Sequence, residues 1–114
     1  MIYIESINNE NSVYIKVNGY LSSNDIKNFI NEYKQKIRGI KTTKCNLIIE
    51  VDPFQYDKVS EVKNMCMMFY KTGYKKIYLI DPNNYIMSNI KLNSLEKKMF
   101  LNAIKIIDSK FDIK

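Results

Sequence analysis

Apolar residues in this chain form short runs typical of β-strands, and polar turn residues separate them. The runs cover 2–4, 13–17, 46–51 and 76–80. Polar residues at 8–11 favour an antiparallel hairpin between the first two strands. The run at 46–51 is almost continuously apolar, which predicts a central strand covered on both faces. We expect Gly19 to turn the chain out of the sheet, and Pro53 to end the third strand because proline cannot donate a ladder hydrogen bond.

Between the strands, apolar residues recur at intervals of three or four, the spacing of one helix face. This spacing predicts helices that begin at Ser22 or Ser23 and end near residue 38, and at 57–72 and 93–109. Ser22 with Asp25, and Asn93 with Glu96, form capping-box patterns at two helix starts. Gly39 and Gly73 are placed to end the first two helices, because glycine readily adopts the left-handed conformation.

The same spacing predicts which side chains of the later helices face the core. For the second helix they are Val59, Val62, Cys66, Phe69 and Tyr70. For the terminal helix they are Leu95, Met99, Ala103, Ile106 and Ile107. The segment 83–92 suits either a short helix or a short strand. The order is therefore β-β-α-β-α-β-(short element)-α, which predicts one α/β domain over 1–114 with a mixed sheet and right-handed crossovers.

The formal net charge is +6, carried by 17 lysines and a single arginine. The densest basic stretch follows the end of the first predicted helix and comprises Lys34, Lys36, Arg38, Lys41 and Lys44. This cluster could bind phosphate groups of a nucleic acid or an anionic surface, or it could be a solvated face that complements the helix dipole. Because specific phosphate and base recognition relies on arginine, the lysine-rich balance argues against a nucleic-acid partner.

The chain contains no histidine, so the usual general base near neutral pH and the commonest metal ligand are missing. Cys45 and Cys66 lack the spacing of a zinc site and are expected to be reduced, packed thiols. We expect no metal and no cofactor. The first residues lack the basic and long apolar regions of a signal peptide, and no apolar run reaches the length of a membrane span. The sequence therefore predicts a cytoplasmic protein without membrane insertion.

Carboxylates lie at the ends of two neighbouring predicted strands. Glu50 and Asp52 are two positions apart and so share one face, and Asp81 ends the next strand. The carboxyl edge of an α/β sheet often holds ligands, so the three could bind a hard cation such as magnesium, or a small substrate. The alternative is that Asp52 and Asp81 simply begin Asp-Pro turns.

The second predicted helix is apolar around nearly its whole circumference at 65–70. Met65 and Met68 fall outside its expected buried stripe, and Leu101 falls outside that of the terminal helix. Exposed methionine suits adaptable contact surfaces, so these three residues could belong to a homodimer or partner interface. The alternative is that another helix of the same chain covers them.

The order of elements and some local sequence resemble the STAS family, the sulfate-transporter and anti-sigma-factor-antagonist domains, including their SpoIIAA-like relatives. The segments that carry the resemblance are 17–21 before the first helix, 47–52 before the second, and Gly73 before the fourth strand. The resemblance implies a small mixed sheet with helices mainly on one side. It also implies a non-enzymatic, bacterial regulatory module whose partner is a kinase or a sigma-pathway protein.

In the family, a serine or threonine at the start of the second helix is phosphorylated, in an acidic stretch that contains glycine. The corresponding segment here has no glycine, and Ser60 lies three positions after Asp57. Ser60 is therefore either the phosphoacceptor or a first-turn residue with a local hydrogen bond. Of the three function classes, we expect protein interaction first. Anionic-surface binding and a small ligand- or cation-dependent enzyme are the alternatives.

Overall fold

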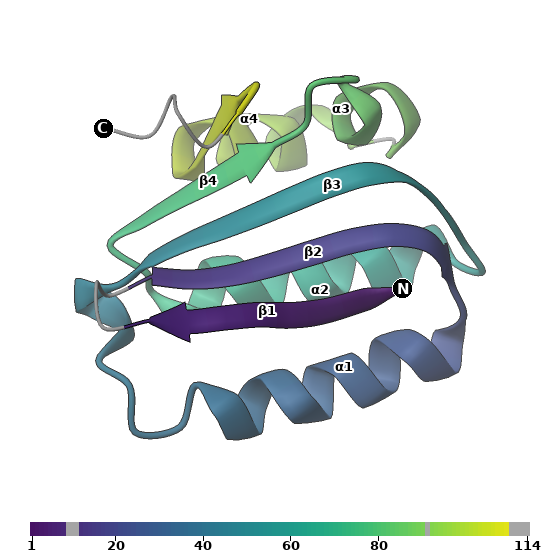
Figure 1. Ribbon diagram of the computed structural model, residues 1–114. Coiled ribbons are helices and arrows are strands. Elements are labelled where there is room, and N and C mark those ends of the chain that lie inside the picture. The colour runs from purple at the N-terminus through teal and green to yellow at the C-terminus, as the bar shows by residue number, and fades with distance from the viewer. Residues whose placement is uncertain (9–11, 91, 110–114) are drawn as a thin grey trace.

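The computed structural model describes residues 1–8, 12–90 and 92–109, and its strands form one five-stranded sheet (Figure 1). The strands are β1 (Ile2–Asn8), β2 (Ser12–Leu21), β3 (Asn46–Tyr56), β4 (Lys76–Ile80) and β5 (Ile104–Ile107). They lie side by side in chain order. β1 and β2 pair antiparallel, and every later pair is parallel. The expected hairpin and mixed sheet are confirmed.

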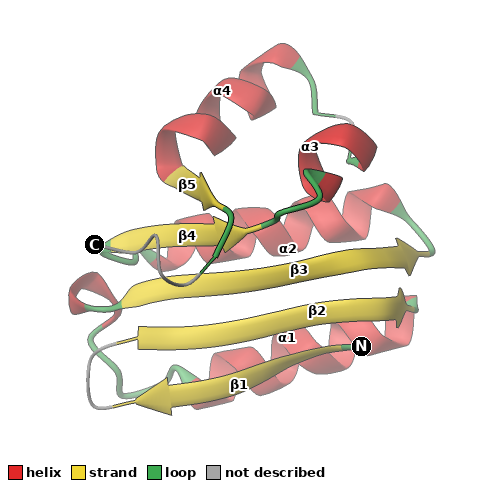
Figure 2. Cartoon of the chain, turned by 45° about the horizontal axis from the view of Figure 1, so that its top comes forward, coloured by secondary structure: helices red, strands yellow, loops and turns green. Residues whose placement is uncertain are grey.

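The helices are α1 (Ser23–Lys36), α2 (Val59–Thr72), α3 (Tyr85–Asn89) and α4 (Ser94–Ala103), with a 3₁₀ turn at Thr42–Lys44. Figure 2 shows α1 and α2 behind the sheet, and α3 and α4 beyond β4, near β5. The helices therefore cover mainly one face, as the resemblance implies. The segment 83–92, which the sequence left open, contains the short helix α3.

Burial alternates along β3, because its two faces have different neighbours. Leu47, Ile49 and Val51 are buried and belong to the main core, together with residues of α1 and α2. Ile48 points to the other face and packs against a smaller cluster formed by Tyr78, Ile80 and Ile107. The second face of β3 is thus only partly covered, whereas its apolar run predicts that both faces are covered. β4 is the strand that is buried on both faces, from Ile77 to Ile80.

Both predicted capping boxes are present. The Ser22 side chain accepts from the backbone N–H of Asp25, whose carboxylate accepts from the backbone N–H of Ser22. Asn93 and Glu96 make the same reciprocal pair at the start of α4. Gly73 ends α2 with φ 81°, in the left-handed region where glycine avoids the penalty that other residues meet.

β2 and β3 run further than expected, because a register shift accommodates Gly19 and Pro53. Val17 pairs with Val51 but Gly19 pairs with Phe54, so two residues of β3 lie opposite the single Asn18 of β2. Gly19 adopts φ 70° at this bulge instead of leaving the sheet. Pro53 falls inside the irregular stretch, where no ladder hydrogen bond is required from it. Both strands then continue, to Leu21 and Tyr56.

The terminal helix is shorter than predicted, and a fifth strand follows it. α4 ends at Ala103, and Ile104 to Ile107 pair in parallel with Ile77 to Ile80. Three of the four β5 residues are isoleucine, which favours strands, and β4 offers them an open edge. The predicted inward stripe is wrong for Leu95 and Met99, which are 68% and 36% exposed.

α2 is rotated relative to the predicted stripe. The residues buried along it are Val62, Met65 and Phe69, while Val59 and Tyr70 are exposed. Phe69 sits edge-on to Phe29 and Tyr33 of α1, with ring centroids 6.2 and 5.3 Å apart. Met65 of α2 is only 3% exposed and belongs to the main core, so it cannot contribute to a surface contact.

Candidate functional site

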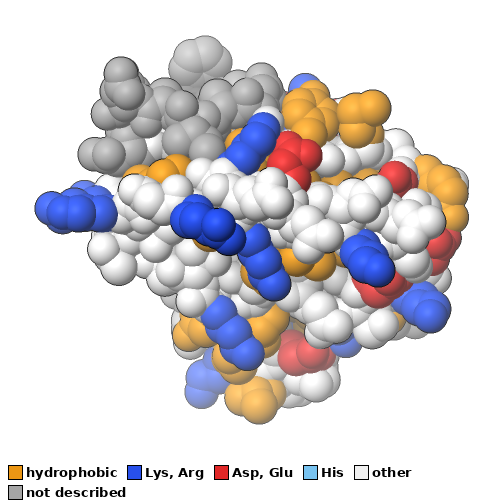
Figure 3. Space-filling view, turned by 90° about the horizontal axis from the view of Figure 1, so that it is seen from below, with side chains coloured by type: hydrophobic (Ala, Val, Ile, Leu, Met, Phe, Trp, Pro, Cys, Tyr) orange, Lys and Arg blue, Asp and Glu red, His pale blue; other side chains and the backbone are white. Residues whose placement is uncertain are grey.

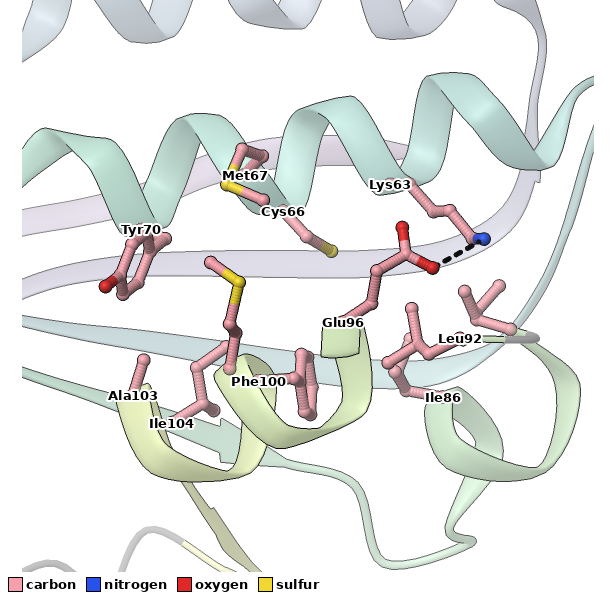
Figure 4. Close-up of a pocket in the computed structure, with 12 residues that line it drawn as sticks. Lys63, Cys66, Met67, Tyr70, Ile86, Leu92, Glu96, Phe100, Ala103 and Ile104 are labelled. Carbon is pink, nitrogen blue, oxygen red and sulfur yellow. Dashed lines mark hydrogen bonds and ion pairs between the residues drawn. The ribbon is translucent and has the colours of Figure 1, made fainter. Parts of the chain in front are cut away.

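A cavity of about 60 Å³ lies between α2 and α4, and we call it the α2–α4 groove (Figure 4). Its lining from α2 is Lys63, Cys66, Met67 and Tyr70. Its lining from α4 is Glu96, Met99, Phe100 and Ala103. The remaining lining is Ile86, Ile90, Leu92 and Ile104. Most of these side chains are apolar, so the groove is suited to apolar contacts.

An ion pair closes one end of the α2–α4 groove. Lys63 Nζ lies 3.1 Å from Glu96 Oε1, and Figure 4 shows the pair reaching across from α2 to α4. The pKa of Glu96 is lowered, first by the backbone N–H of Asn93 and then by Lys63. Glu96 therefore has two roles, since it completes the capping box of α4 and also ties α4 to α2.

Exposed apolar residues are concentrated on the helices that form this groove. Among the described residues, the large apolar side chains that are exposed are Met1, Tyr20, Val59, Tyr70, Leu95, Met99 and Leu101. Five of these seven lie on α2 or α4. Tyr70 and Met99 line the groove itself, whereas Val59, Leu95 and Leu101 do not. Monomers seldom present such a concentration without a binding role.

The helical spacing predicts that Tyr70, Leu95 and Met99 are buried, so the sequence does not reveal their exposure. Their spacing is that of a buried stripe. They are exposed to solvent because α4 ends at Ala103 and because α2 is rotated about its axis relative to the predicted stripe. Leu101 is 49% exposed and its interface role stays a prediction. Met68 is partly buried and packs against the main core, so most of its surface is covered by its own chain.

Cys66 points from α2 into the α2–α4 groove (Figure 4). Removal from water raises the pKa of its thiol to about 11, because burial disfavours the charged thiolate. A thiol in this state is a poor nucleophile at neutral pH. Cys45 is buried and unpaired, and its thiol donates to the carbonyl of Lys41. Cys66 therefore contributes to packing in the groove.

A polar cluster joins the first turns of α1 and α2. The Asp57 carboxylate accepts from the Tyr20 hydroxyl and from the backbone N–H of Ser23, the latter at 2.9 Å. The Ser23 hydroxyl donates to Glu61 at 2.7 Å. Ser60 lies beside this cluster in the first turn of α2 and is exposed. Its role as phosphoacceptor stays a prediction.

Asp57 should make the stability of this cluster dependent on pH. The Tyr20 hydroxyl, followed by the Ser23 N–H, lowers the pKa of Asp57 below its ordinary 3.8. A lowered folded-state pKa stabilises the fold above the ordinary value, and this stabilisation is lost as the pH falls through the folded-state pKa. We expect Asp57→Asn to lower the melting temperature at pH 7, with the difference from wild type shrinking below about pH 4. A difference that is constant from pH 7 to pH 3 would contradict this role.

The three predicted cation ligands are not brought together. Glu50 accepts from the Tyr14 hydroxyl at 2.6 Å and pairs with Lys16 at 3.2 Å, on the face opposite α1 and α2. Asp81 is 3% exposed and accepts from the backbone N–H groups of Tyr85 and Ile86, both at 2.8 Å, at the start of α3. Asp52 is exposed. Across the described ranges, no group of three or more acidic or cysteine side chains is placed to hold a metal ion.

The basic residues of the predicted phosphate-binding stretch are all exposed. Lys36 pairs with Glu32 at 3.1 Å, and Lys34 lines a shallow hollow between α1 and α2. Arg38, Lys41 and Lys44 follow in the turn and the 3₁₀ segment after α1. Figure 3, viewed from the α1 side, shows basic side chains scattered over the face rather than gathered in one patch. Anion binding by this stretch stays a prediction.

Among the residues that the structure describes, no helix combines the length and apolar content needed to cross a bilayer. No protein-family model and no curated protein matches the chain. A solved structure does resemble it: an uncharacterized protein of the DUF3478 family with a SpoIIAA-like fold, from Shewanella loihica PV-4. The two align with a TM-score of 0.60 and 16% identity, over 98% of this chain and 88% of the other. At that identity the likeness shows the fold, which is SpoIIAA-like as the sequence resemblance implied.

Proposed function

We propose that this chain is a non-enzymatic module that works by binding another protein, and that the α2–α4 groove makes the contact. The observation that carries the proposal is the concentration of exposed apolar side chains on α2 and α4, two of which, Tyr70 and Met99, line an apolar cavity. Burial of such surface is the main favourable contribution to protein association. A SpoIIAA-like fold is consistent with this role, since domains with this fold are generally non-enzymatic.

The chemistry of the groove also supports binding over catalysis. Lys63 and Glu96 neutralise each other, and the raised pKa of Cys66 keeps it protonated. The carboxylate of Asp81 is committed to backbone N–H groups elsewhere in the fold. The groove thus offers contact area and one fixed ion pair, which is what an interface core with a polar edge requires.

Capture of partners from the source cells tests this proposal. The immobilised chain is compared with the double variant Tyr70→Ser/Met99→Ser, in which both altered residues are exposed and line the groove. We expect wild type to retain a protein in near-stoichiometric amount, and the double variant to retain at least tenfold less. Leu101→Ser is the matched control, because Leu101 is exposed on α4 like Met99 but does not line the groove.

The two possible failures have different meanings. If wild type retains no protein in near-stoichiometric amount, the proposed function is wrong. If the double variant retains as much as wild type, the contact is made by another surface and the assignment to the α2–α4 groove is wrong. Circular dichroism melting of each variant checks that the fold is retained.

A further inference from the structure

We infer that the end of the molecule at which β3 and β4 start binds single-stranded nucleic acid through its phosphate groups, without regard to base sequence. The surface is formed by residues 34–44 and 71–76, and we call it the basic end. This inference goes beyond the proposed function, because it concerns a second surface that borders the α2–α4 groove at Met67, Tyr70 and Ala103.

The fold joins two basic segments that lie far apart in the sequence. The backbone N–H of Lys75 donates to the carbonyl of Cys45 at 2.8 Å, and the Thr42 hydroxyl donates to the carbonyl of Thr72 at 3.2 Å. The turn after α1 is thus held against the turn between α2 and β4, at the left of Figure 1. The second segment adds three exposed lysines to the predicted phosphate-binding stretch, namely Lys71, Lys75 and Lys76.

The positive charge of the basic end is not balanced by carboxylates. Residues 33–49 and 71–80 contain eight basic side chains and no aspartate or glutamate, whereas the rest of the chain contains ten basic and twelve acidic side chains. Lys36 pairs with Glu32 at 3.1 Å. Within 1–8, 12–90 and 92–109, the other seven basic side chains have no ion-pair partner. They are therefore available to an anionic ligand.

Helix dipoles account for only part of this charge. Basic side chains in the last turn of a helix offset the partial negative charge at its carboxyl end. Lys34 and Lys36 have this position in α1, and Lys71 has it in α2. The other five basic residues lie beyond the two helices, so this structural role does not explain their concentration at one end.

A surface of one sign fits a partner that carries only the opposite sign. Nucleic acid has a negative charge at every phosphate and no positive charge. A protein partner presents charges of both signs, so its own basic residues would face like charge here. The shortage of arginine argues against reading of the bases. It does not argue against contact with phosphates, which lysine makes as a point charge.

Two hollows beside the end of α2 favour a flexible strand over a flat surface. One, of about 440 Å³, lies between α1 and α2 and is lined by Lys34 and Lys71. The other, of about 470 Å³, lies between α2, β4 and the end of α4, and its lysines are Lys71, Lys75 and Lys76. A single strand can bend into both hollows, whereas the flat surface of a bilayer cannot.

Tyr70 favours a nucleic acid over a polyanion without rings. It is 46% exposed and lines the second hollow beside the three lysines. Proteins that bind single strands without sequence preference combine lysine contacts to the backbone with aromatic rings on which bases stack. In a duplex the bases are stacked on one another, so only a single strand can offer one to Tyr70.

Fluorescence anisotropy with a labelled oligothymidylate of about 12 nucleotides tests the inference, since single-strand sites cover about 4–16 nucleotides. We expect binding at about 50 mM salt, and affinity about 100-fold lower at about 200 mM salt if about five phosphates are contacted. A polyglutamate peptide of equal charge should bind at least fivefold more weakly. Tyr70→Ala should bind the oligonucleotide at least threefold more weakly than Tyr70→Phe, which keeps an aromatic ring.

Two triple variants with the same loss of charge locate the contact. We expect Lys71→Gln/Lys75→Gln/Lys76→Gln to bind the oligonucleotide at least tenfold more weakly than wild type. The matched control is Lys27→Gln/Lys58→Gln/Lys97→Gln, whose altered residues are exposed elsewhere, and it should bind within threefold of wild type. Circular dichroism melting checks that both variants keep the fold.

Four results would overturn the inference. The first is no binding of the oligonucleotide at about 50 mM salt, and the second is an equal loss in the two triple variants. The third is polyglutamate binding as tight as oligonucleotide binding, which would assign the basic end to an acidic protein. The fourth is sedimentation with vesicles of three parts phosphatidylcholine to one part phosphatidylglycerol without binding of the oligonucleotide, which would assign it to a membrane surface.

Discussion

Replacing Phe69 with alanine is expected to lower the free energy of unfolding by about 3–5 kcal/mol, the cost typical of truncating a buried phenylalanine. Phe69 is 3% exposed and packs between α2, α1 and the sheet, with its ring against Phe29 and Tyr33. Removal of the ring leaves a cavity that these rigid aromatic neighbours cannot readily fill. Urea unfolding followed by circular dichroism measures the effect.

Tyr70→Ala is the matched control, since Tyr70 is the next residue of α2 and is 46% exposed. We expect its effect on the free energy of unfolding to stay within about 0.5 kcal/mol of wild type, which is usual for surface positions. The predicted stripe assigned both residues to the core and therefore implies similar losses for both. A loss at Tyr70 that approaches the loss at Phe69 would contradict the observed rotation of α2.

Asp81→Ala is expected to lower the free energy of unfolding by about 3 kcal/mol, because hydrogen bonds to a charged group contribute about 1.5–3 kcal/mol each and are not fully additive. The buried carboxylate accepts one hydrogen bond with each oxygen, from the backbone N–H groups of Tyr85 and Ile86. Without it, at least the buried N–H of Ile86 loses its acceptor. We expect Asp81→Asn to cause roughly half the loss, since one of its two side-chain oxygens becomes an NH₂ group.

Asp52→Asn provides the comparison, because Asp52 also precedes a proline but lies within β3 and is exposed. We expect a change within about 0.5 kcal/mol. If the two aspartates instead held a cation, magnesium would raise the melting temperature of wild type and both substitutions would remove that effect. Magnesium-dependent melting of wild type would thus contradict the purely structural role of Asp81.

The parts of the fold that depend on local chemistry could be predicted from the sequence. The capping boxes at Ser22 and Asn93 are set by residues three positions apart, and Gly73 ends α2 through its own backbone freedom. The strand β4 could be predicted because its apolar run is buried on both faces. In each case the residues that determine the feature lie close to it in the sequence.

The parts that depend on distant partners could not be predicted. The residues Ile104–Ile107 continue the helical spacing of α4, and only the open edge of β4 makes the extended conformation favourable. Gly19 and Pro53 are residues typical of turns, yet β2 and β3 continue past them because one bulge in their pairing accommodates both. The candidate site could not be predicted for the same reason, because Tyr70 and Met99 have the spacing of buried residues and only the packing of α2 and α4 leaves them exposed.

The agreement between strand order and chain order has a consequence for biosynthesis. β1 and β2 can pair as soon as both have left the ribosome, and each following strand attaches to the outer margin of those already paired. None of the described strands has to be inserted between two earlier ones, so the order of these five strands does not require the nascent sheet to reopen. During synthesis, each new strand therefore pairs with the edge strand that was made just before it. The last of the five to pair is β5, which has four residues and is the shortest.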